Sequence, residues 1–383
     1  MIWIGKRNMS WIRFDVRKIV ANILLAITSI IIIITLAEIF VRIFPPKGVY
    51  SPSVYDDEIG LIIYPESKVI YNKVRYTESF TNKDGFLDVD HQQGNNRKIK
   101  VAFWGDSYVE AMQVTSKQRF FRLLPETIGK NELEYFGFGI SGQGTLHSYL
   151  NYRKQSKKYD FDVVVYVFVE NDLGDNILSI SNNNLRPMAK LSESSPTGFE
   201  INNEYKKYNS LFFRMSRSIN RHSLLANIVV QKIILLKQKG IMLKLNEEEK
   251  KMTTVAKGNA PEQNNLPSTW PAPVKEYAEK LGFNILKEWN KEVRDAGKDF
   301  IVFYVPRSEE TLYSSPKDND SWKMWLQRSC ATLNIQFIDP SDSFIRERKQ
   351  GVQIYDDHWT PEGHIIVAHI IEEWLTNYFK MGN

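Results

Sequence analysis

The chain has 383 residues, of which 43% are hydrophobic and 25% are charged, a balance that supports a large packed core and excludes a mostly disordered protein. Its single cysteine, Cys330, excludes an intramolecular disulfide framework and a cysteine-based zinc site. The net charge is +5, but +4 of it lies in the first 43 residues. Because nucleic-acid binding needs a basic face on the folded domain, we expect no nucleic-acid partner.

Residues 19–44 form an apolar segment near the amino terminus. No charged side chain lies between Ile19 and Ala37, and the segment is long enough to cross the ~30 Å hydrocarbon core of a bilayer as a helix. A cleaved signal peptide is the alternative, but the segment exceeds the ~7–15 apolar residues of a secretory signal and lacks a clear cleavage site. We therefore expect an uncleaved transmembrane anchor that ends at Pro45-Pro46.

The basic residues around this segment predict its orientation. Five Lys and Arg residues precede it, whereas Arg42 and Lys47 are the only two in the next fifteen residues or so. Since cytoplasmic flanks carry the excess of Lys and Arg, residues 1–18 are expected in the cytoplasm. The rest of the chain would then face the periplasm or the exterior, on a single-pass protein of the inner membrane.

Beyond a polar, turn-rich connecting arm at residues 45–95, β-rich runs alternate with helical stretches. This alternation predicts an α/β domain over residues 96–383, with a parallel sheet covered by helices on both faces. The strands are expected at residues 98–104, 134–140, 161–169, 300–305 and 335–338. An amphipathic helix is expected at residues 361–379, with Pro361 near its first turn.

The alternation fails between residues 178 and 284, which predicts an insertion. Within it, residues 218–245 are expected to form a basic, apolar helix, and residues 247–273 a loose segment. Two placements are open for this helix. Its mixture of basic and apolar residues fits a membrane surface, but we favour a lid packed on the domain.

Three short motifs follow predicted strands, where open α/β sheets place their sites. Gly105-Asp106-Ser107 is a sharp strand-to-helix turn that exposes a serine hydroxyl. The glycines of residues 139–144 (GISGQG) allow the backbone to approach a substrate and to present N–H groups. Asn171, in residues 170–172, offers a carboxamide as a hydrogen-bond donor. Each motif is weak by itself: Gly-Asp-Ser also occurs by chance, residues 139–144 are equally explained as a plain glycine turn, and Asn-Asp after a strand is more often a cap or a turn.

A fourth motif, residues 356–364 (DDHWTPEGH), contains a candidate general base, His358. A histidine that takes a proton from serine needs an acceptor for its other ring nitrogen, and a nearby carboxylate on a tight turn can be that acceptor. A metal site is the alternative, but no further histidine-carboxylate cluster completes one. His364, in the opening of the last helix, is expected to be structural.

In this order, the four motifs resemble those of the SGNH/GDSL hydrolase superfamily, over roughly residues 96–178 and 284–383. Residues 81–86 (TNKDGF) are similar to the turn that precedes the serine motif in membrane-anchored bacterial members. The resemblance implies a flavodoxin-like, three-layer α/β/α fold. It also implies ester hydrolysis or acyl transfer without a metal or cofactor.

The resemblance also implies a role for each matched residue. Ser107 is the nucleophile, and His358 is the general base, oriented by an acid just before it. The backbone N–H groups of Ser107 and Gly142 and the side chain of Asn171 form the oxyanion hole.

The sequence departs from the family pattern at three positions. Ala111 and Val169 replace glycines that are frequent in the family. Tyr355 stands three residues before the histidine, where many relatives carry the catalytic aspartate. Some relatives instead have the spacing Asp-x-His-Trp, which matches Asp356 and leaves Asp357 as the second choice.

We therefore expect a membrane-anchored, extracytoplasmic serine esterase that removes O-acyl groups, in the first place O-acetyl, from a surface glycan. Three alternatives remain: an O-acyltransferase of cell-surface polysaccharide that receives acetyl groups from a membrane acyltransferase partner, a lipid esterase, and a non-catalytic assembly module. The intact serine, asparagine and histidine argue against the last. Trp359 could stack on a sugar ring, although tryptophan at such a position more often serves packing.

Overall fold

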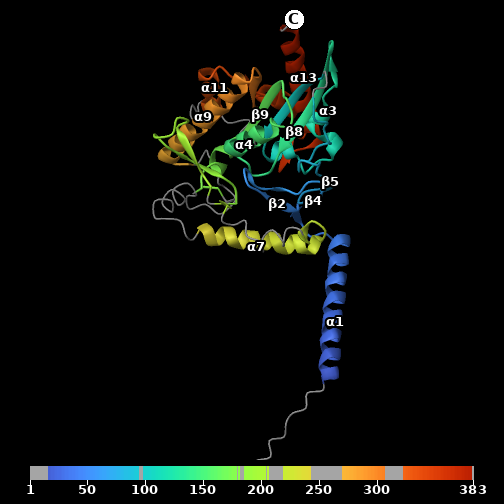
Figure 1. The fold of residues 1–383 in the computed structure, drawn as a ribbon. Helices are drawn as coiled ribbons and strands as arrows, with labels where there is room; N and C mark the ends of the chain where they lie inside the picture. The colour runs from blue at the N-terminus through green and yellow to red at the C-terminus, as the bar shows by residue number, and fades with distance from the viewer. Residues whose placement is uncertain are drawn as a thin grey trace, which may run out of the picture.

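The computed structural model describes residues 16–94, 98–178, 180–181, 185–203, 205–206, 219–242, 270–306 and 322–381. A long helix, α1 (Val16–Ile43), extends away from the folded domain, and a second helix, α7 (Leu224–Met242), lies between the domain and α1, with one of its ends next to the carboxyl-terminal end of α1 (Figure 1). Within the described residues, Arg17–Ile43 is the single helix whose length and composition suit a membrane crossing. It fits the expected single-pass anchor.

The domain is built on a six-stranded sheet with the order β13-β12-β9-β6-β8-β7. Its strands are β6 (Ile99–Gly105), β7 (Thr127–Ile128), β8 (Asn131–Gly139), β9 (Val163–Val169), β12 (Asp299–Val305) and β13 (Gln336–Ile338). All neighbours pair in parallel except β7, which pairs antiparallel with β8. The five predicted strands are all present, and together they form the parallel part of the sheet.

Helices cover both faces because successive residues of a strand point to opposite sides. On one face, α4 (Thr145–Gln155), α9 (Ala272–Asp295) and α11 (Trp322–Thr332) share a core with Ala102 and Trp104. On the other, α3 (Phe120–Leu123), α12 (Ser341–Lys349) and α13 (Pro361–Met381) share a core with Val101 and Phe103. Because both faces are covered, all seven residues of β9 are buried. The expected three-layer α/β/α fold is confirmed.

The connecting arm contains strands that the sequence analysis did not predict. They are β1 (Gly48–Tyr50), β2 (Ser53–Asp56), β3 (Gly60–Ile63), β4 (Lys68–Asn72) and β5 (Tyr76–Phe80). β1, β4 and β5 form one antiparallel sheet, and β2 and β3 form a hairpin. Such short strands, exposed on one face, carry too few apolar residues for a clear pattern.

The described part of the expected insertion contains a β-hairpin, β10 (Met188–Leu191) and β11 (Phe199–Asn202), followed by α7. The helix predicted at residues 218–245 corresponds to α7. Most of the predicted loose segment, residues 247–269, lies outside the described residues. α9, which packs on the sheet, begins inside the predicted insertion, and the domain boundaries themselves stay a prediction.

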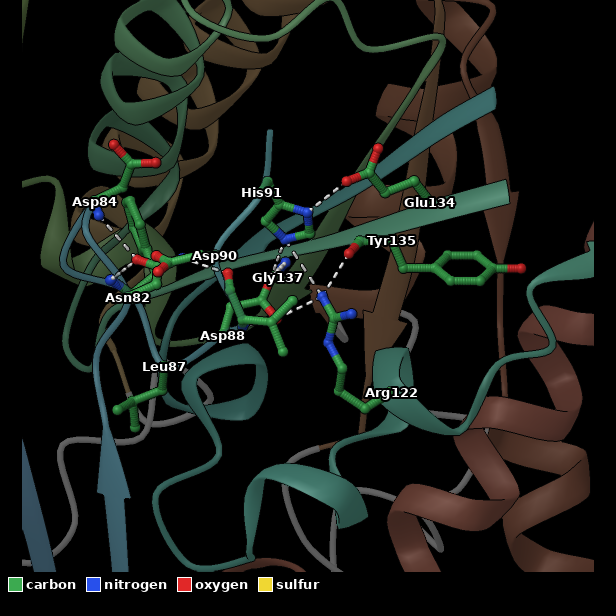
Figure 2. A network of polar contacts seen from close by, with 12 residues as sticks. Asn82, Asp84, Leu87, Asp88, Asp90, His91, Arg122, Glu134, Tyr135 and Gly137 are labelled. Carbon is green, nitrogen blue, oxygen red and sulfur yellow. Dashed lines mark hydrogen bonds and ion pairs between the residues drawn. The ribbon is translucent and has the colours of Figure 1, made fainter. Parts of the chain in front are cut away.

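A buried charge network fixes the end of the arm to β8 (Figure 2). The side chain of Asp88 is only 2% exposed and accepts hydrogen bonds from the Gly137 N–H at 2.9 Å and from His91 at 3.0 Å. It also forms a 2.5 Å ion pair with Arg122. The other ring nitrogen of His91 lies 2.8 Å from Glu134. Residue 88 therefore holds two basic side chains and a strand N–H at once.

We expect Asp88→Asn to lower the free energy of unfolding by about 3–5 kcal/mol, because it leaves the largely buried Arg122 guanidinium without the carboxylate it pairs with. Asp90→Asn is the matched control, since Asp90 is exposed and accepts one hydrogen bond, from the Lys83 N–H; it should cost no more than about 1 kcal/mol. Thermal unfolding of the full chain in mild detergent, followed by tryptophan fluorescence, measures both. Equal losses would mean that the network does not hold the arm.

Candidate active site

Ser107 is the first residue of a one-turn helix, α2 (Ser107–Glu110), directly after β6. Asp106 caps this helix, because its side chain accepts a 3.0 Å hydrogen bond from the Tyr108 N–H. A Cβ on Gly105 would lie 2.8 Å from Val109 Cγ2 and 2.9 Å from the Val167 oxygen, so the turn requires glycine. The turn presents the Ser107 hydroxyl at the carboxyl end of the sheet.

Ala111, one of the departures from the family pattern, ends α2 with a φ of 49° in the left-handed region. Glycine adopts this conformation at no steric cost, whereas an L-residue such as alanine is strained by roughly 1–2 kcal/mol. The frequent glycine of the family at this position is therefore explained by backbone conformation. Alanine in place of this glycine keeps the turn but adds backbone strain.

His358 faces Ser107 across the site. Its Nε2 lies 2.7 Å from Ser107 Oγ, within hydrogen-bond distance. His358 belongs to a very short hairpin of β14 (Tyr355–Asp356) and β15 (His358–Trp359), with Asp357 at the turn. The next residue, Trp359, is fully buried in the core and anchors this hairpin. Trp359 is therefore a packing residue, and stacking on a sugar ring is excluded by its burial.

The two candidate acids lie in different places. Asp357 Oδ2 is 3.3 Å from His358 Nδ1. Asp356, which the sequence analysis favours, instead has its carboxylate 3.3 Å from Arg75. The structure thus brings the second choice, Asp357, to the imidazole. The reason is the arm, which supplies a cation to Asp356 and could not be placed next to it from the sequence.

Side chains from β4 and the turn after it complete the surroundings of Asp357. The Tyr71 hydroxyl donates to Asp357 Oδ2 at 3.3 Å, and Lys73 Nζ lies 3.9 Å from the same oxygen. The hydrogen bond from His358, opposed by partial burial and aided by the charges of His358 and Lys73, lowers the pKa of Asp357 to about 2. Asp357 is therefore ionised at neutral pH, as an acceptor for the imidazole N–H must be.

The other predicted site residues lie beside Ser107 because of the strand order. β6 is flanked by β9 and β8, so residues that follow these three strands meet at one edge of the sheet. Asn171 precedes α5 (Asp172–Asp175), and its Nδ2 lies 3.3 Å from Asp106 Oδ2 and 3.1 Å from Asp175 Oδ2. Gly142, after β8, has a φ of 68°. Ser107, Gly142 and Asn171 all remain partly exposed.

Two charged residues that the sequence analysis missed hold the loop that contains Gly142. The Ser141 N–H and hydroxyl both donate to Glu110 Oε2, the N–H at 2.9 Å. Arg186 donates to the Gly142 oxygen at 2.5 Å and to the Ser141 oxygen at 3.1 Å. In a trans peptide the C=O and the following N–H point in opposite directions. Arg186, by binding the Ser141 oxygen, therefore turns the Gly142 N–H to the opposite side.

Burial governs the ionisation of this pair. Burial, partly offset by hydrogen bonds from Ser141 and by the charge of Arg186, raises the pKa of Glu110 to about 7. Burial lowers the pKa of Arg186 to about 10, which leaves the guanidinium charged at neutral pH. Glu110 lies in the helix of the serine motif and could have been suspected. Arg186 lies in the insertion, where no pattern marks it.

His364 is fully buried, and its Nδ1 accepts a 3.3 Å hydrogen bond from the Phe120 N–H. Burial lowers its pKa to about 3, so it is neutral, in keeping with the expected structural role. Among the residues that the structure describes, no group of three or more His, Cys, Asp or Glu side chains is placed to hold a metal ion.

A family model described as GDSL-like lipase/acylhydrolase matches residues 79–371. The chain therefore belongs to this family, and it is a serine hydrolase that acts on ester bonds. The SGNH/GDSL resemblance of the four motifs is confirmed. No curated protein matches the chain.

Solved structures similar to this chain include a Bacteroides fragilis protein described as an acylhydrolase, at 13% identity and a TM-score of 0.38. The match covers 75% of this chain and 91% of that one. An acetyl xylan esterase matches at 13% identity and a TM-score of 0.37, over 72% of this chain and 98% of that one. At this identity, neither structure identifies the substrate of this chain.

The geometry makes opposite predictions for the two acids. Asp357→Asn should lower turnover of an ester by something like 10⁴-fold, because an amide cannot stabilise the imidazolium or hold the required tautomer. Asp356→Asn, the matched control, should cost far less, since it loses only its pairing with Arg75. Steady-state hydrolysis by the full chain measures both. A larger loss for Asp356→Asn would reverse the assignment, and equally small losses would leave His358 without an essential acid.

Proposed function

We propose that this protein is a membrane-anchored serine esterase that acts outside the cytoplasm and removes O-acyl groups, in the first place O-acetyl, from a surface glycan. The observation that carries the catalytic part is the 2.7 Å contact between Ser107 Oγ and His358 Nε2 at the carboxyl end of β6. A serine hydroxyl is a weak nucleophile at neutral pH, and an adjacent base makes it reactive.

In the first step, Ser107 Oγ attacks the ester carbonyl carbon while His358 Nε2 takes the hydroxyl proton. The N–H groups of Ser107 and Gly142 and the carboxamide of Asn171 donate to the oxyanion that forms. The bond between the carbonyl carbon and the sugar oxygen then breaks, and His358 returns the proton to that oxygen. The acyl group remains on Ser107.

In the second step, water attacks the acyl-enzyme while His358 again takes a proton. The carboxylic acid leaves, and Ser107 recovers its hydroxyl proton from His358. Asp357 accepts a hydrogen bond from the Nδ1–H of His358 in both steps, which fixes the tautomer of the imidazole and stabilises the imidazolium. If a sugar hydroxyl replaces water in this step, the same residues perform O-acyl transfer.

The rim of the site supports a polar substrate. Next to His358 the side chains of Lys73, Arg75, Asp356 and Asp357 are between 32% and 53% exposed. Hydroxyl groups of a glycan can hydrogen-bond to such charged groups, whereas an extended lipid chain would have to desolvate them at a cost. A glycan O-acyl ester is therefore the better candidate than a lipid ester.

The proposed nucleophile is tested by labelling the full chain in mild detergent with an organophosphonate. Wild type should be labelled on the peptide that contains Gly105-Asp106-Ser107, and Ser107→Ala should not. His358→Ala should be labelled far more slowly, and Asn171→Ala should lose ~10²–10³ in turnover through the missing oxyanion donor. Ser156→Ala is the matched control, because Ser156 lies on the surface at the end of α4.

The result also separates the alternatives. Labelling with hydrolysis of short-chain esters supports the esterase, and labelling with acetyl transfer to a sugar but slow hydrolysis supports the transferase. A preference for long-chain esters supports the lipid esterase. If folded wild type neither takes the label nor cleaves any ester in a broad panel, the non-catalytic module becomes the better account.

The location rests on the five basic residues before the apolar segment of residues 19–44, against Arg42 and Lys47 at its other end. We expect a reporter that is active only outside the cytoplasm to be active when fused after Asn383, on a full-length, uncleaved chain. A reporter that is active only in the cytoplasm, fused at the same position, is the control. Activity of that control alone would overturn the location and, with it, a surface glycan as the substrate.

A further inference from the structure

Helix α7 carries an apolar face that is exposed. Val229, Ile233 and Leu236 are 50%, 37% and 69% exposed. They are spaced at i, i+4 and i+7, so they form one stripe along the helix. The helix of a soluble domain directs such a stripe toward the core; this one directs it outward.

The opposite face of α7 is the one that contacts the domain. Asn227 and Val230 are buried, and Val230 packs with Leu185 and Leu61 from the insertion and the arm. The exposed stripe therefore points away from the domain. In Figure 1 the domain lies on one side of α7 and α1 extends on the other. α7 thus packs on the domain with one face, as the placement favoured from the sequence expects, and leaves its other face exposed.

The start of α7 is fixed to α1 by one carboxylate. Glu38 of α1 accepts hydrogen bonds from the N–H groups of Leu224 and Leu225, at 3.0 and 2.9 Å, and from the Ser223 hydroxyl at 2.8 Å. A carboxylate at a helix N-terminus satisfies donors that have no partner within the helix and interacts favourably with the helix dipole. Arg42 also donates to the His222 oxygen at 2.8 Å. The start of α7 is therefore held at a defined height along α1, next to Glu38.

The height of Glu38 along α1 matches the edge of a bilayer. A helix rises ~1.5 Å per residue, so the distance along α1 from Arg17 to Glu38 is roughly 32 Å, close to the ~30 Å thickness of the hydrocarbon core. If Arg17 and Lys18 lie among the headgroups on one side, Glu38 and the start of α7 lie at the opposite boundary. The exposed stripe of α7 then faces the acyl chains.

The charges of α7 fit the same position. The helix contains Lys232, Lys237 and Lys239 and no acidic residue, and Lys232 is exposed. Interfacial helices combine lysines, which interact with anionic headgroups, with an apolar face buried ~5–10 Å into the boundary.

We propose that α7 lies in the outer interface of the bilayer that α1 crosses, with Val229, Ile233 and Leu236 among the lipids. This inference rests on the proposed membrane anchor. It gives the domain two attachments to the membrane. A domain attached only by α1 could turn about that helix, whereas a domain attached by both α1 and α7 keeps one orientation toward the lipid surface.

The test uses the full chain in vesicles of phosphatidylethanolamine and phosphatidylglycerol. In a Cys330→Ala background, an environment-sensitive fluorophore is attached to Leu236→Cys. Ile32→Cys, in the middle of α1, reports on the anchor. Lys190→Cys, on β10, is the exposed control, because the Lys190 side chain is 63% exposed. Iodide quenches a label in water, and a doxyl group near the lipid headgroup quenches a label at the interface. Ester hydrolysis before labelling confirms that each variant is folded.

We expect the label at residue 236 to be quenched several-fold less by iodide than the label at residue 190, and to be quenched by the shallow doxyl lipid. Strong iodide quenching at residue 236 would overturn the proposal. Shielding from both quenchers would also overturn it, in favour of a protein partner or a second copy of this chain. Quenching of residue 32 by deep doxyl lipids shows that the anchor is inserted, so a failure of α7 is distinguished from a failure of the anchor.

Discussion

The geometry of the candidate active site depends on a close approach between the backbone of α2 and the end of β8. Gly105 and Gly139 are paired across β6 and β8, and a Cβ on Gly139 would lie 2.1 Å from the Glu110 nitrogen. Since real Cβ atoms do not come so near, only glycine lets α2 lie on the end of β8. That contact places Ser107 beside the loop with Gly142, and it brings Glu110 within reach of Ser141. The relative positions of Ser107, Glu110 and the loop with Gly142 therefore require that residue 139 have no side chain.

Buried ionisable side chains then hold the parts that this approach brings together. Glu110 and Arg186 bind opposite sides of the Ser141–Gly142 segment. In an environment of low dielectric, such groups are costly unless each finds partners, so the arrangement that satisfies them is strongly preferred over its alternatives. The loop that is proposed to stabilise the oxyanion is held by hydrogen bonds to Glu110 and Arg186 as well as by packing, and Arg186 comes from the insertion.

The arm joins α1, the proposed membrane anchor, to the proposed catalytic residues. It begins at the end of α1, supplies Tyr71 to Asp357 and Arg75 to Asp356, and ends on the sheet through Asp88. The insertion contacts the arm in turn, since Arg186 donates to the Leu61 oxygen at 3.2 Å. Segments that look like attachments to a hydrolase domain thus take part in building its site.

The sequence by itself determined the parallel strands of the main sheet, the apolar amino-terminal segment and the positions of the four motifs, because these depend on runs of apolar residues and on local turns. The family match confirmed the fold and the hydrolase class that Ser107 and His358 suggested. The approach of Asp357 rather than Asp356 to His358 comes from tertiary structure, because Arg75, on the arm, binds Asp356 from far away in the sequence. The same holds for Arg186 and for the outward face of α7, since no local pattern records which side of a helix the folded chain covers.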